Sequence, residues 1–328
     1  MSNFKRYSLF PILDEKAYEF YQKQEISHWS ESELDFVADL KDYRSVNPQI
    51  KHMLDTILAF FLSGDGVISE NITYRFLTEC KTYEEKAMFI SQLHIELIHA
   101  ATYGMAVFTF KRDLEETSKL IETAQDTDCI KAKMNFMEKW MLSDLPKYQR
   151  LVAFGCAEGI FFCTLFAVIF WFRSKGLFPN FILANELIAK DESLHRDWSV
   201  YLFSLENSNN EIKVKEIIQE ALEVEFGFVD YILPEPIEDL NKDKLKIYAK
   251  LIADNLIQQL GYETIYNVKN PFTWLDDISM EQKSNFFEVR SGAYSKKSLT
   301  DVMNWKKRTG IEENNDKKLF NNPEDIDF

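Results

Sequence analysis

The sequence predicts an all-α fold in which long helices pack into a bundle. Glycine and proline are scarce, with 10 and 8 in 328 residues, and no proline lies between Pro48 and Pro146. Long helices suit this scarcity, whereas a fold rich in β-turns would need more of both residues. Apolar residues recur at helical spacing, as in QIKHMLDTILAFFLS at 49–63, and no segment alternates convincingly as a strand would.

The first part of the chain reads as helices separated by turn signals. Residues 1–30 are expected to be extended and then helical around FPILDEKAYEFYQKQ. The helix over 49–63 is followed by GDG at 64–66, which indicates a turn or kink, and a helix resumes in VISENITYRFL. The apolar spacing over 83–112 predicts another long helix.

The rest of the chain continues the helical pattern up to a charged end. The polar segment DLEETSKLIETAQDTD is either an exposed helix or a connection. Further helices are expected at 128–145, 148–174, 181–208, 211–229 and 241–264. From about Ser291 the chain is charged and rich in Asn and Lys, which is typical of a flexible segment. We therefore expect one domain over 1–290 and a flexible tail over 291–328.

Composition and charge narrow the functional class. Hydrophobic residues make up 46% and aromatic residues 14% of the chain, which is ample for a large core. The net charge of −15 argues against nucleic acid or an anionic membrane as a partner, because both favour clusters of Lys and Arg. The four cysteines form no CxxC pattern, and MSNFKRYSLF lacks the apolar core of a signal peptide. These features predict a cytoplasmic protein.

One segment, VAFGCAEGIFFCTLFAVIFWF at 152–172, is long and apolar enough to span a bilayer. Its sole charge, Glu158, would then lie in hydrocarbon, and no other segment is comparably apolar. The alternative is the fully surrounded central helix of a soluble bundle. We favour the soluble alternative, because acids on other helices offer Glu158 a functional reason to be buried.

Acids and histidines recur on the apolar helices in a pattern typical of metal ligands. ExxH occurs twice, at Glu96/His99 and Glu192/His195, and Glu158 lies within the most apolar segment. A buried carboxylate is costly unless it is paired, protonated or bound to a metal. Carboxylate and imidazole ligands suit iron, manganese or zinc, while the absence of HExxH argues against a zinc peptidase. Two ExxH helices with further inward acids are the known ligand pattern of ferritin-like di-iron and di-manganese bundles.

Two further residues bear on this candidate site. The ferritin-like pattern needs an acid from a fourth helix, and Asp65 is the best candidate, although an aspartate between two glycines also fits a plain turn. Tyr103 lies one turn beyond His99 and shares the helix face of Glu96, at about 100° per residue. A buried tyrosine is usually core filling. Here, an oxidised metal pair would be placed to remove its electron and proton.

At this point the segments resemble a known family, the small, radical-generating subunit of class I ribonucleotide reductase in its eukaryotic-like form. The resemblance covers nearly the whole chain and rests on WSESELDF, ILAFFLSGDGVISENI, ELIHAATY, AFGCAEGIFF, NELIAKDESLH and NPFTWLDDIS…NFFEVRSGAY. It implies a ferritin-like homodimer and an oxidoreductase, ribonucleoside-diphosphate reductase, that is active only with a separate large subunit. In this family a metal pair reacts with dioxygen, with an electron donor for assembly, and oxidises a tyrosine. The radical then passes to the large subunit, where ribonucleotides are reduced to deoxyribonucleotides.

Carried over by position, the resemblance implies two iron ions per chain, or alternatively manganese. One ion would be held by Asp65, Glu96 and His99, and the other by Glu158, Glu192 and His195. The helix of Asp65 would then continue through the glycines with a local distortion. Tyr103 would carry the stable radical, in an apolar pocket that includes Phe162, Phe166 and Ile188.

The resemblance also implies a route by which the radical leaves the site. Trp29 matches the tryptophan on this route, and Asp191 matches the carboxylate that links it to His99. Tyr294 matches a relay tyrosine on the tail. The C-terminal residues resemble the segment that docks into the large subunit: Asp325, Ile326, Asp327 and Phe328.

Two departures from the family pattern and two alternative functions stay open. Gly64 stands where serine is usual, which would loosen the first metal site, and Lys190 replaces the usual arginine before Asp191, which would retune the transfer path. One alternative function is another ferritin-like di-metal oxidase, which the DIDF ending disfavours. The other is a scaffold that binds the large subunit but makes no radical, which the retained ligands and phenol disfavour.

Overall fold

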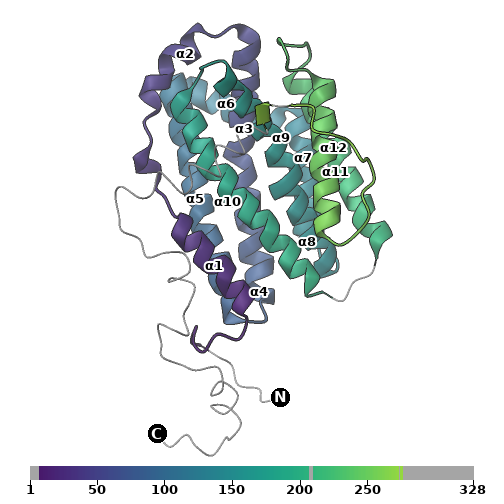
Figure 1. Cartoon of the computed structure of the whole chain (residues 1–328). Helices are drawn as coiled ribbons and strands as arrows, with labels where there is room; N and C mark the ends of the chain where they lie inside the picture. Colours follow the sequence, from purple (N-terminus) through teal and green to yellow (C-terminus); the bar gives the residue numbers. More distant parts are fainter. Residues whose placement is uncertain (1–6, 207–209, 273, 276–328) are drawn as a thin grey trace, which may run out of the picture.

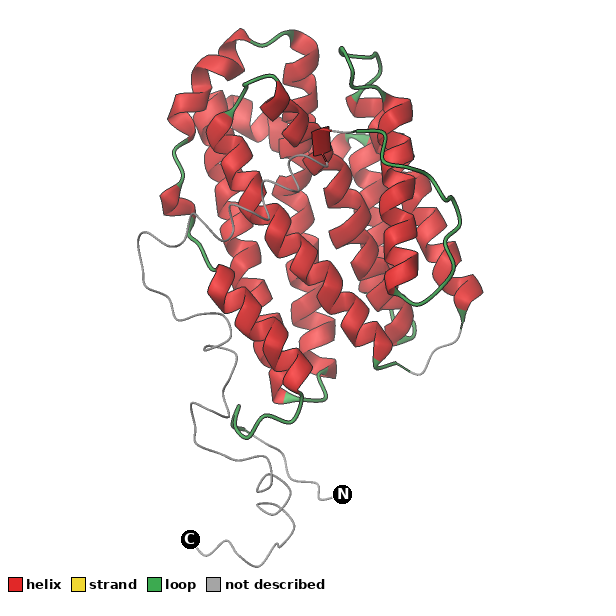
Figure 2. Cartoon of the chain, viewed as in Figure 1, coloured by secondary structure: helices red, strands yellow, loops and turns green. Residues whose placement is uncertain are grey.

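The computed structural model describes residues 7–206, 210–272 and 274–275, and this part of the chain is built from helices and short connections without a named strand (Figure 2). The predicted all-α fold is therefore confirmed. The α-helices are α1 (Glu15–Ser27), α2 (Leu40–Ser45), α3 (Pro48–Asn71), α4 (Leu77–Glu79), α5 (Tyr83–Lys111), α6 (Leu114–Asp126), α7 (Asp128–Met141), α8 (Lys147–Cys156), α9 (Phe162–Ser174), α10 (Pro179–Ser204), α11 (Glu211–Ile232) and α12 (Lys242–Gln259). Two 3-10 turns, η1 (Glu31–Glu33) and η2 (Phe36–Asp39), and two π-helical turns, η3 (Ile72–Phe76) and η4 (Ala157–Phe161), complete the set.

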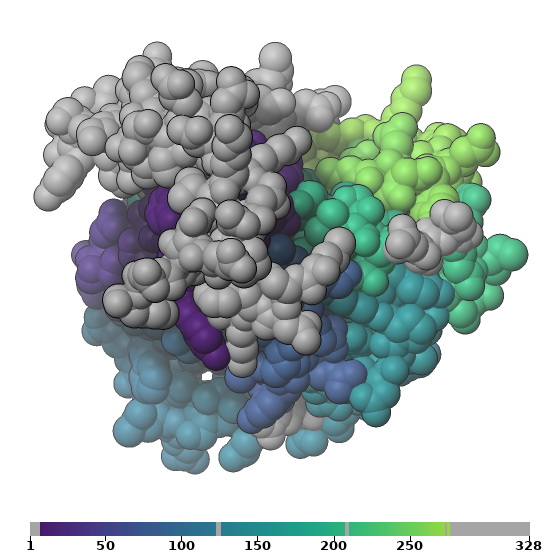
Figure 3. Space-filling model, turned by 90° about the horizontal axis from the view of Figure 1, so that it is seen from below, coloured from purple at the N-terminus to yellow at the C-terminus, as the bar shows by residue number. Residues whose placement is uncertain are grey.

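Four long rods form the centre of the bundle: α3, α5, the continuous α8–η4–α9 unit, and α10. Helix α10 crosses the front of the molecule in Figure 1 and packs on α5, α8 and α9, while α3 packs on α5. The pair α11 and α12 covers the side of α8 and α9, and the N-terminal helix α1 lies on α5 and α10. In the view from below, segments from the start, middle and end of the described chain are all visible at this end of the bundle (Figure 3).

Local capping explains where two central helices begin. Thr82 precedes α5, and its side chain accepts a hydrogen bond from the backbone N–H of Glu85 at 3.1 Å. Asn47 caps α3 in the same way through the N–H of Ile50, at 2.9 Å, and is followed by Pro48 at the first helical position. Each cap satisfies an amide that would otherwise lack a partner at a helix start.

Helix α3 runs through Gly64–Asp65–Gly66 without a turn, so the expected turn or kink at 64–66 is wrong. Each glycine costs about 1 kcal/mol relative to alanine in a helix. Fully buried apolar residues on both sides, such as Phe60 and Ile68, outweigh this cost by anchoring the helix in the core. The distortion lies further along the chain, in the π-helical turn η3.

The helix expected over 148–174 is instead two α-helices joined by the π-helical turn η4. Taken as one unit, Lys147–Ser174 is, within the described residues, the one helix whose length and composition would allow it to cross a membrane. However, 94% of its most apolar window is buried inside the protein. Such burial is expected of the central helix of a soluble bundle. Because neighbouring helices surround it, this helix can be apolar on every face.

Candidate metal centre

All six predicted metal-ligating residues converge in the middle of the bundle. Asp65 comes from α3, Glu96 and His99 from α5, Glu158 from the turn η4, and Glu192 and His195 from α10, and none is more than 2% exposed. Their donor atoms form two groups, each with all atoms within 4.8 Å of one another: Asp65, Glu96 and His99, and Glu96, Glu158, Glu192 and His195. Glu96 belongs to both groups, whereas the resemblance assigned it to one ion only. Each group would hold one divalent cation, and Glu96 could serve either of the two.

The two imidazoles face the carboxylates through the same ring nitrogen. Nδ1 of His99 lies 3.0 Å from Glu192 Oε1 and 3.3 Å from Glu96 Oε2. Nδ1 of His195 lies 3.0 Å from Glu96 Oε1 and 3.0 Å from Glu192 Oε2. The i to i+3 spacing of each ExxH motif places its acid and its histidine on one face, and packing of α5 against α10 brings the two motifs together.

The protonation of this cluster is uneven. Burial and the neighbouring charge of Glu96 raise the pKa of Asp65 well above its usual range, and burial with the charges of Glu192 and Glu96 does the same for Glu158. Burial also acts to raise the pKa of Glu192, but His99 and His195 hold it at about 2. Burial acts to lower the pKa of His195, but Glu96 and Glu192 raise it to about 9. Metal uptake must therefore release protons, because ligating carboxylates and imidazoles bind as the deprotonated forms.

Several donor atoms of the cluster have no hydrogen-bond partner in the described part of the chain. These atoms are Asp65 Oδ2, Glu96 Oε2, His99 Nδ1 and Glu158 Oε2. Buried polar atoms are almost always paired, so a group of donor atoms without hydrogen bonds at one place favours a bound ligand. Divalent cations with a preference for oxygen and nitrogen donors meet this need. The buried carboxylate and histidine cluster therefore fits a di-metal site.

A glutamine that the sequence analysis missed joins two of these acids. Gln92 is fully buried on α5, and its Nε2 donates to Glu96 Oε1 at 3.2 Å and to Glu158 Oε1 at 3.1 Å. Its position, one turn before Glu96, places it on the ligand face of α5. The sequence signal that could have identified Gln92 is a polar residue four positions before Glu96 on the same predicted helix.

Asp191 connects the cluster to a buried tryptophan, Trp29. Its Oδ2 accepts a hydrogen bond from the indole Nε1 of Trp29 at 2.8 Å and lies 3.2 Å from His99 Nε2. The Trp29 and His99 rings stack with centroids 5.9 Å apart. Because a carboxylate only accepts, Nε2 of His99 carries the proton and Nδ1 is left free to ligate. Trp29, Asp191 and His99 thus lie in contact, and their role in radical transfer stays a prediction.

A second glutamine that the sequence analysis missed, Gln24 on α1, contacts Nε2 of His195 in the same way that Asp191 contacts Nε2 of His99. Its Nε2 donates to Asp191 Oδ1 at 2.9 Å, and its Oε1 lies 3.0 Å from His195 Nε2. Since Asp191 can only accept, the amide orientation is determined, and the Nε2 proton of His195 points to Gln24. Nδ1 of His195 is then free for a metal. No local sequence signal marks Gln24, because its partners lie more than 160 residues away.

We expect Gln24→Met to lower the affinity for one metal ion by about 10- to 100-fold, the usual effect of losing a group that orients a ligating histidine. Titration of the metal-free protein with manganese(II), with free ion detected by electron paramagnetic resonance, measures this change. Gln22→Met removes another buried glutamine from α1 and serves as the matched control. Equal affinities in the two variants would contradict the orienting role of Gln24.

Tyr103 is fully buried beside the cluster, on the same helix as Glu96 and His99. Its ring stacks on Phe61 with centroids 4.2 Å apart, and its hydroxyl donates to Asn185 Oδ1 at 2.9 Å. Burial, followed by the charges of Asp65, Glu192 and Glu96, raises the pKa of Tyr103 well above its usual range. The phenol therefore keeps its proton in the resting protein.

The predicted pocket residues Phe162, Phe166 and Ile188 lie in the apolar layer around Tyr103. The structure adds Phe61 and Phe181 to this pocket. Phe162 and Phe166 are buried against Phe61, with ring centroids 5.5 Å and 5.9 Å away, so they reach Tyr103 through that ring. Ile188 is fully buried on α10. Phe61 and Phe181, the second at 6.4 Å edge-on, are the rings that pack directly on Tyr103.

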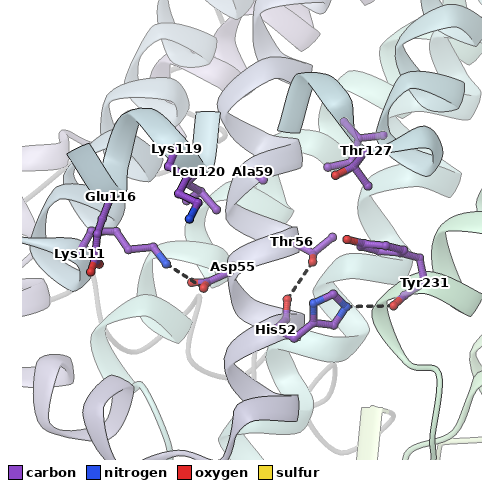
Figure 4. A pocket seen from close by; sticks show the side chains of 11 residues that line it. His52, Asp55, Thr56, Ala59, Lys111, Glu116, Lys119, Leu120, Thr127 and Tyr231 are labelled. Carbon is purple, nitrogen blue, oxygen red and sulfur yellow. Dashed lines mark hydrogen bonds and ion pairs between the residues drawn. The ribbon is translucent and has the colours of Figure 1, made fainter. Parts of the chain in front are cut away.

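A separate cavity of about 350 Å³ lies between α3, α6, α7 and α11 (Figure 4). Two of its polar contacts lie within the chain: Lys111 Nζ lies 2.7 Å from Asp55 Oδ2, and the His52 ring bonds the Tyr231 carbonyl at 3.0 Å. It holds no group of acids and histidines like that of the bundle centre. The metal-ligand chemistry of the described residues is thus concentrated at the bundle centre.

This fold and donor set are those of helical proteins that hold two metal ions between carboxylates and histidines. Comparison with known proteins gives the family. Residues 6–271 match the family described as ribonucleotide reductase, small chain. The chain is 36% identical over 300 residues to the ribonucleoside-diphosphate reductase small chain of Nicotiana tabacum, covering 91% of each chain. It is 37% identical over 295 residues to that of Vaccinia virus (strain Ankara), covering 90% of this chain and 92% of the viral one. The chain belongs to the ribonucleotide reductase small chain family.

Solved structures agree with this assignment. The Rnr4 homodimer of Saccharomyces cerevisiae aligns with a TM-score of 0.76 at 29% identity, over 86% of this chain and 91% of the yeast chain. The dimanganese(II) NrdF of Streptococcus sanguinis aligns with a TM-score of 0.73 at 17% identity, over 81% and 95%, which supports the fold alone. The predicted ferritin-like fold and the predicted class, an oxidoreductase subunit that works with a large subunit, are confirmed.

Several predictions are not tested by these findings. Tyr294, Asp325, Ile326, Asp327, Phe328 and the tail boundary at 290 lie outside the described residues. The effects expected of Gly64 and Lys190 stay predictions: Gly64 is buried beside the Phe60 ring, and Lys190 is exposed on α10. The family match disfavours an unrelated ferritin-like oxidase, while a radical-poor scaffold of the same family stays a separate possibility to test.

Proposed function

We propose that this chain is the radical-generating subunit of a ribonucleoside-diphosphate reductase. The observation that carries the proposal is the fully buried phenol of Tyr103 beside a cluster of four carboxylates and two imidazoles. When bound, a pair of iron or manganese ions supplies, with dioxygen and an electron donor, the oxidising power that converts the tyrosine to its radical. The donor set accepts either metal, and we propose two iron ions per chain with manganese as the alternative.

The residues around Tyr103 keep this radical from being quenched. Phe61 covers one face of its ring, and Phe181 meets it edge-on. Asn185 orients the hydroxyl, and because an amide is not a base, the phenolic proton must leave toward the carboxylate cluster instead. Exclusion of water and reductants by this apolar layer accounts for a long-lived radical.

The radical would leave the site through the hydrogen-bonded residues His99, Asp191 and Trp29. The contacts of 3.2 Å and 2.8 Å support this route, because they let the proton and electron move between adjacent groups. We propose that Tyr294 continues the route on a tail over 291–328, and that Asp325–Phe328 dock that tail into the large subunit. The domain over 1–290 would hold the metal centre, and the protein would act in the cytoplasm.

Reconstitution with ferrous iron and oxygen tests the proposal. About two iron ions per chain, a tyrosyl electron paramagnetic resonance signal, and turnover of ribonucleoside diphosphates with a large subunit of the same family are expected. Deletion of residues 325–328 should abolish turnover and leave the radical signal intact. Zinc or no metal after reconstitution would overturn the proposal. Binding to the large subunit without radical or turnover would favour the scaffold function.

We further propose that the chain forms a homodimer through the outer face of α5. Ile90, Leu97 and Phe108 are 58%, 65% and 54% exposed, and their spacings of seven and eleven residues place them on one helix face. The related yeast protein is described as a homodimer. A second copy of this chain would cover these side chains.

Leu97→Glu should convert the dimer to a monomer, because a buried unpaired carboxylate at the interface would be strongly unfavourable. Sedimentation velocity measures the change in mass. Ile212→Glu, at a residue 74% exposed on α11, is the control and should stay dimeric. A Leu97→Glu protein that sediments as a dimer would place the interface elsewhere.

A further inference from the structure

A lysine is buried among aromatic rings on the far side of the ligand-bearing helices. Lys133 on α7 and Glu225 on α11 are both fully buried, and Lys133 Nζ lies 2.7 Å from Glu225 Oε2. Burial lowers the pKa of Lys133 and raises that of Glu225, while the attraction between the two opposes both shifts. The chemistry proposed for the centre makes no use of this pair.

Three phenylalanine rings enclose the ammonium group. Its Nζ lies 3.9 Å from the ring centroid of Phe228, 4.4 Å from that of Phe60 and 5.0 Å from that of Phe161. It also lies 3.4 Å from the backbone carbonyl oxygen of Phe161. A cation over aromatic faces and near a carbonyl is held in one place from several directions.

Two of these rings belong to the segments that carry candidate ligands. Phe61 and Asp65 follow Phe60 on α3, and the Phe60 ring lies so close to Gly64 that an added Cβ would meet it at 3.4 Å. Phe161 ends the π-helical turn η4, three residues after Glu158. Lys133 therefore contacts the backbone segment of Glu158 directly and that of Asp65 through Phe60.

Stability alone does not explain the pair. Replacing a buried ion pair with uncharged side chains of similar volume is often neutral or stabilising, because both charges must be stripped of water. A π-helical turn is also an irregular backbone that is commonly found at functional sites. A group that fixes the position of that turn has an evident use next to a metal ligand.

We propose that Lys133, balanced by Glu225, is a positioning residue that holds the turn η4 and thereby sets how tightly the Glu158 side of the centre binds its metal ion. Lys133 contacts no metal-ligating atom and acts through the Phe161 carbonyl and ring. The inference deepens the proposed function and rests on the cluster binding two metal ions.

The test compares two double variants in the full-length protein. Lys133→Met with Glu225→Gln removes the buried pair without leaving an unpaired charge. Lys139→Met with Glu220→Gln removes an exposed pair, with atoms 2.7 Å apart, between the same two helices, α7 and α11. The control therefore matches the change in composition and differs in burial and in contact with η4.

Manganese(II) titration gives the first readout. The buried-pair variant should bind one of the two ions about 10- to 100-fold less tightly than the natural protein, the usual range for a group that orients a ligand, and the exposed-pair variant should be unchanged. Equal binding by all three proteins overturns the proposal. If the natural protein itself binds a pair of neither manganese(II) nor ferrous ions, the proposed function fails as well.

Amide hydrogen exchange of the metal-free proteins gives a second readout that needs no metal. Peptides covering residues 157–161 should exchange faster in the buried-pair variant and at the natural rate in the control. Unchanged exchange would show that Lys133 does not hold the turn, whether or not the centre binds metal. A buried-pair variant that fails to fold would make the pair a folding element and would equally overturn the proposal.

Discussion

Tyr103→Phe should abolish the tyrosyl radical and reduce turnover with the large subunit to background, while two metal ions per chain are retained. The substitution removes only the hydroxyl, which donates to Asn185, and leaves a ring that can still stack on Phe61. No side chain of the cluster loses a ligating atom. Electron paramagnetic resonance of the reconstituted protein, with metal analysis of the same sample, measures the two effects separately.

A matched control is available in Tyr43, a buried tyrosine on α2 whose hydroxyl donates to Asp55 at 2.8 Å. Tyr43→Phe removes an equivalent hydroxyl away from the cluster and should leave the signal and turnover intact. A signal that persists in Tyr103→Phe would move the radical to another residue. A Tyr103→Phe protein without metal would instead show that the phenol supports the centre structurally.

Glu96→Gln should cost the protein both metal ions, because Glu96 is the one residue shared by the two donor groups. An amide is a much poorer ligand for hard cations than a carboxylate. At metal concentrations about 100 times the dissociation constant, a bound ion stabilises the fold by about 2.7 kcal/mol, so the metal-dependent rise in Tm should disappear. Calorimetry with and without manganese(II) measures this difference.

The metal-free Glu96→Gln protein should remain folded, because the amide has the size of the carboxylate and its oxygen can still accept the hydrogen bond from Gln92. Glu84→Gln is the control: Glu84 is fully buried on the same helix, but it accepts a hydrogen bond from the Leu13 backbone instead of facing the cluster. Full metal binding by Glu96→Gln would mean that the two ions are held without a shared carboxylate.

Local pattern determined much of this protein in advance. The scarcity of glycine and proline, with apolar residues at helical spacing, was enough to predict the all-α fold, and the two ExxH motifs placed four candidate ligands on two helix faces. Helical periodicity is a property of neighbouring residues, so it can be read without knowing the packing. The same local reasoning misjudged 64–66, where glycine signals predicted a turn and burial of α3 preserved the helix.

Tertiary structure alone decided which distant groups meet. Gln24 reaches Asp191 and His195, Asn185 reaches Tyr103, and Lys133 reaches Glu225 only because α1, α5, α7, α10 and α11 pack as they do. A single glutamine or lysine on a helix has the same local pattern whether it faces solvent or a buried partner. The sequence therefore determined which chemistry each helix carries, and the packing of the helices determined how those groups are oriented, shielded and paired.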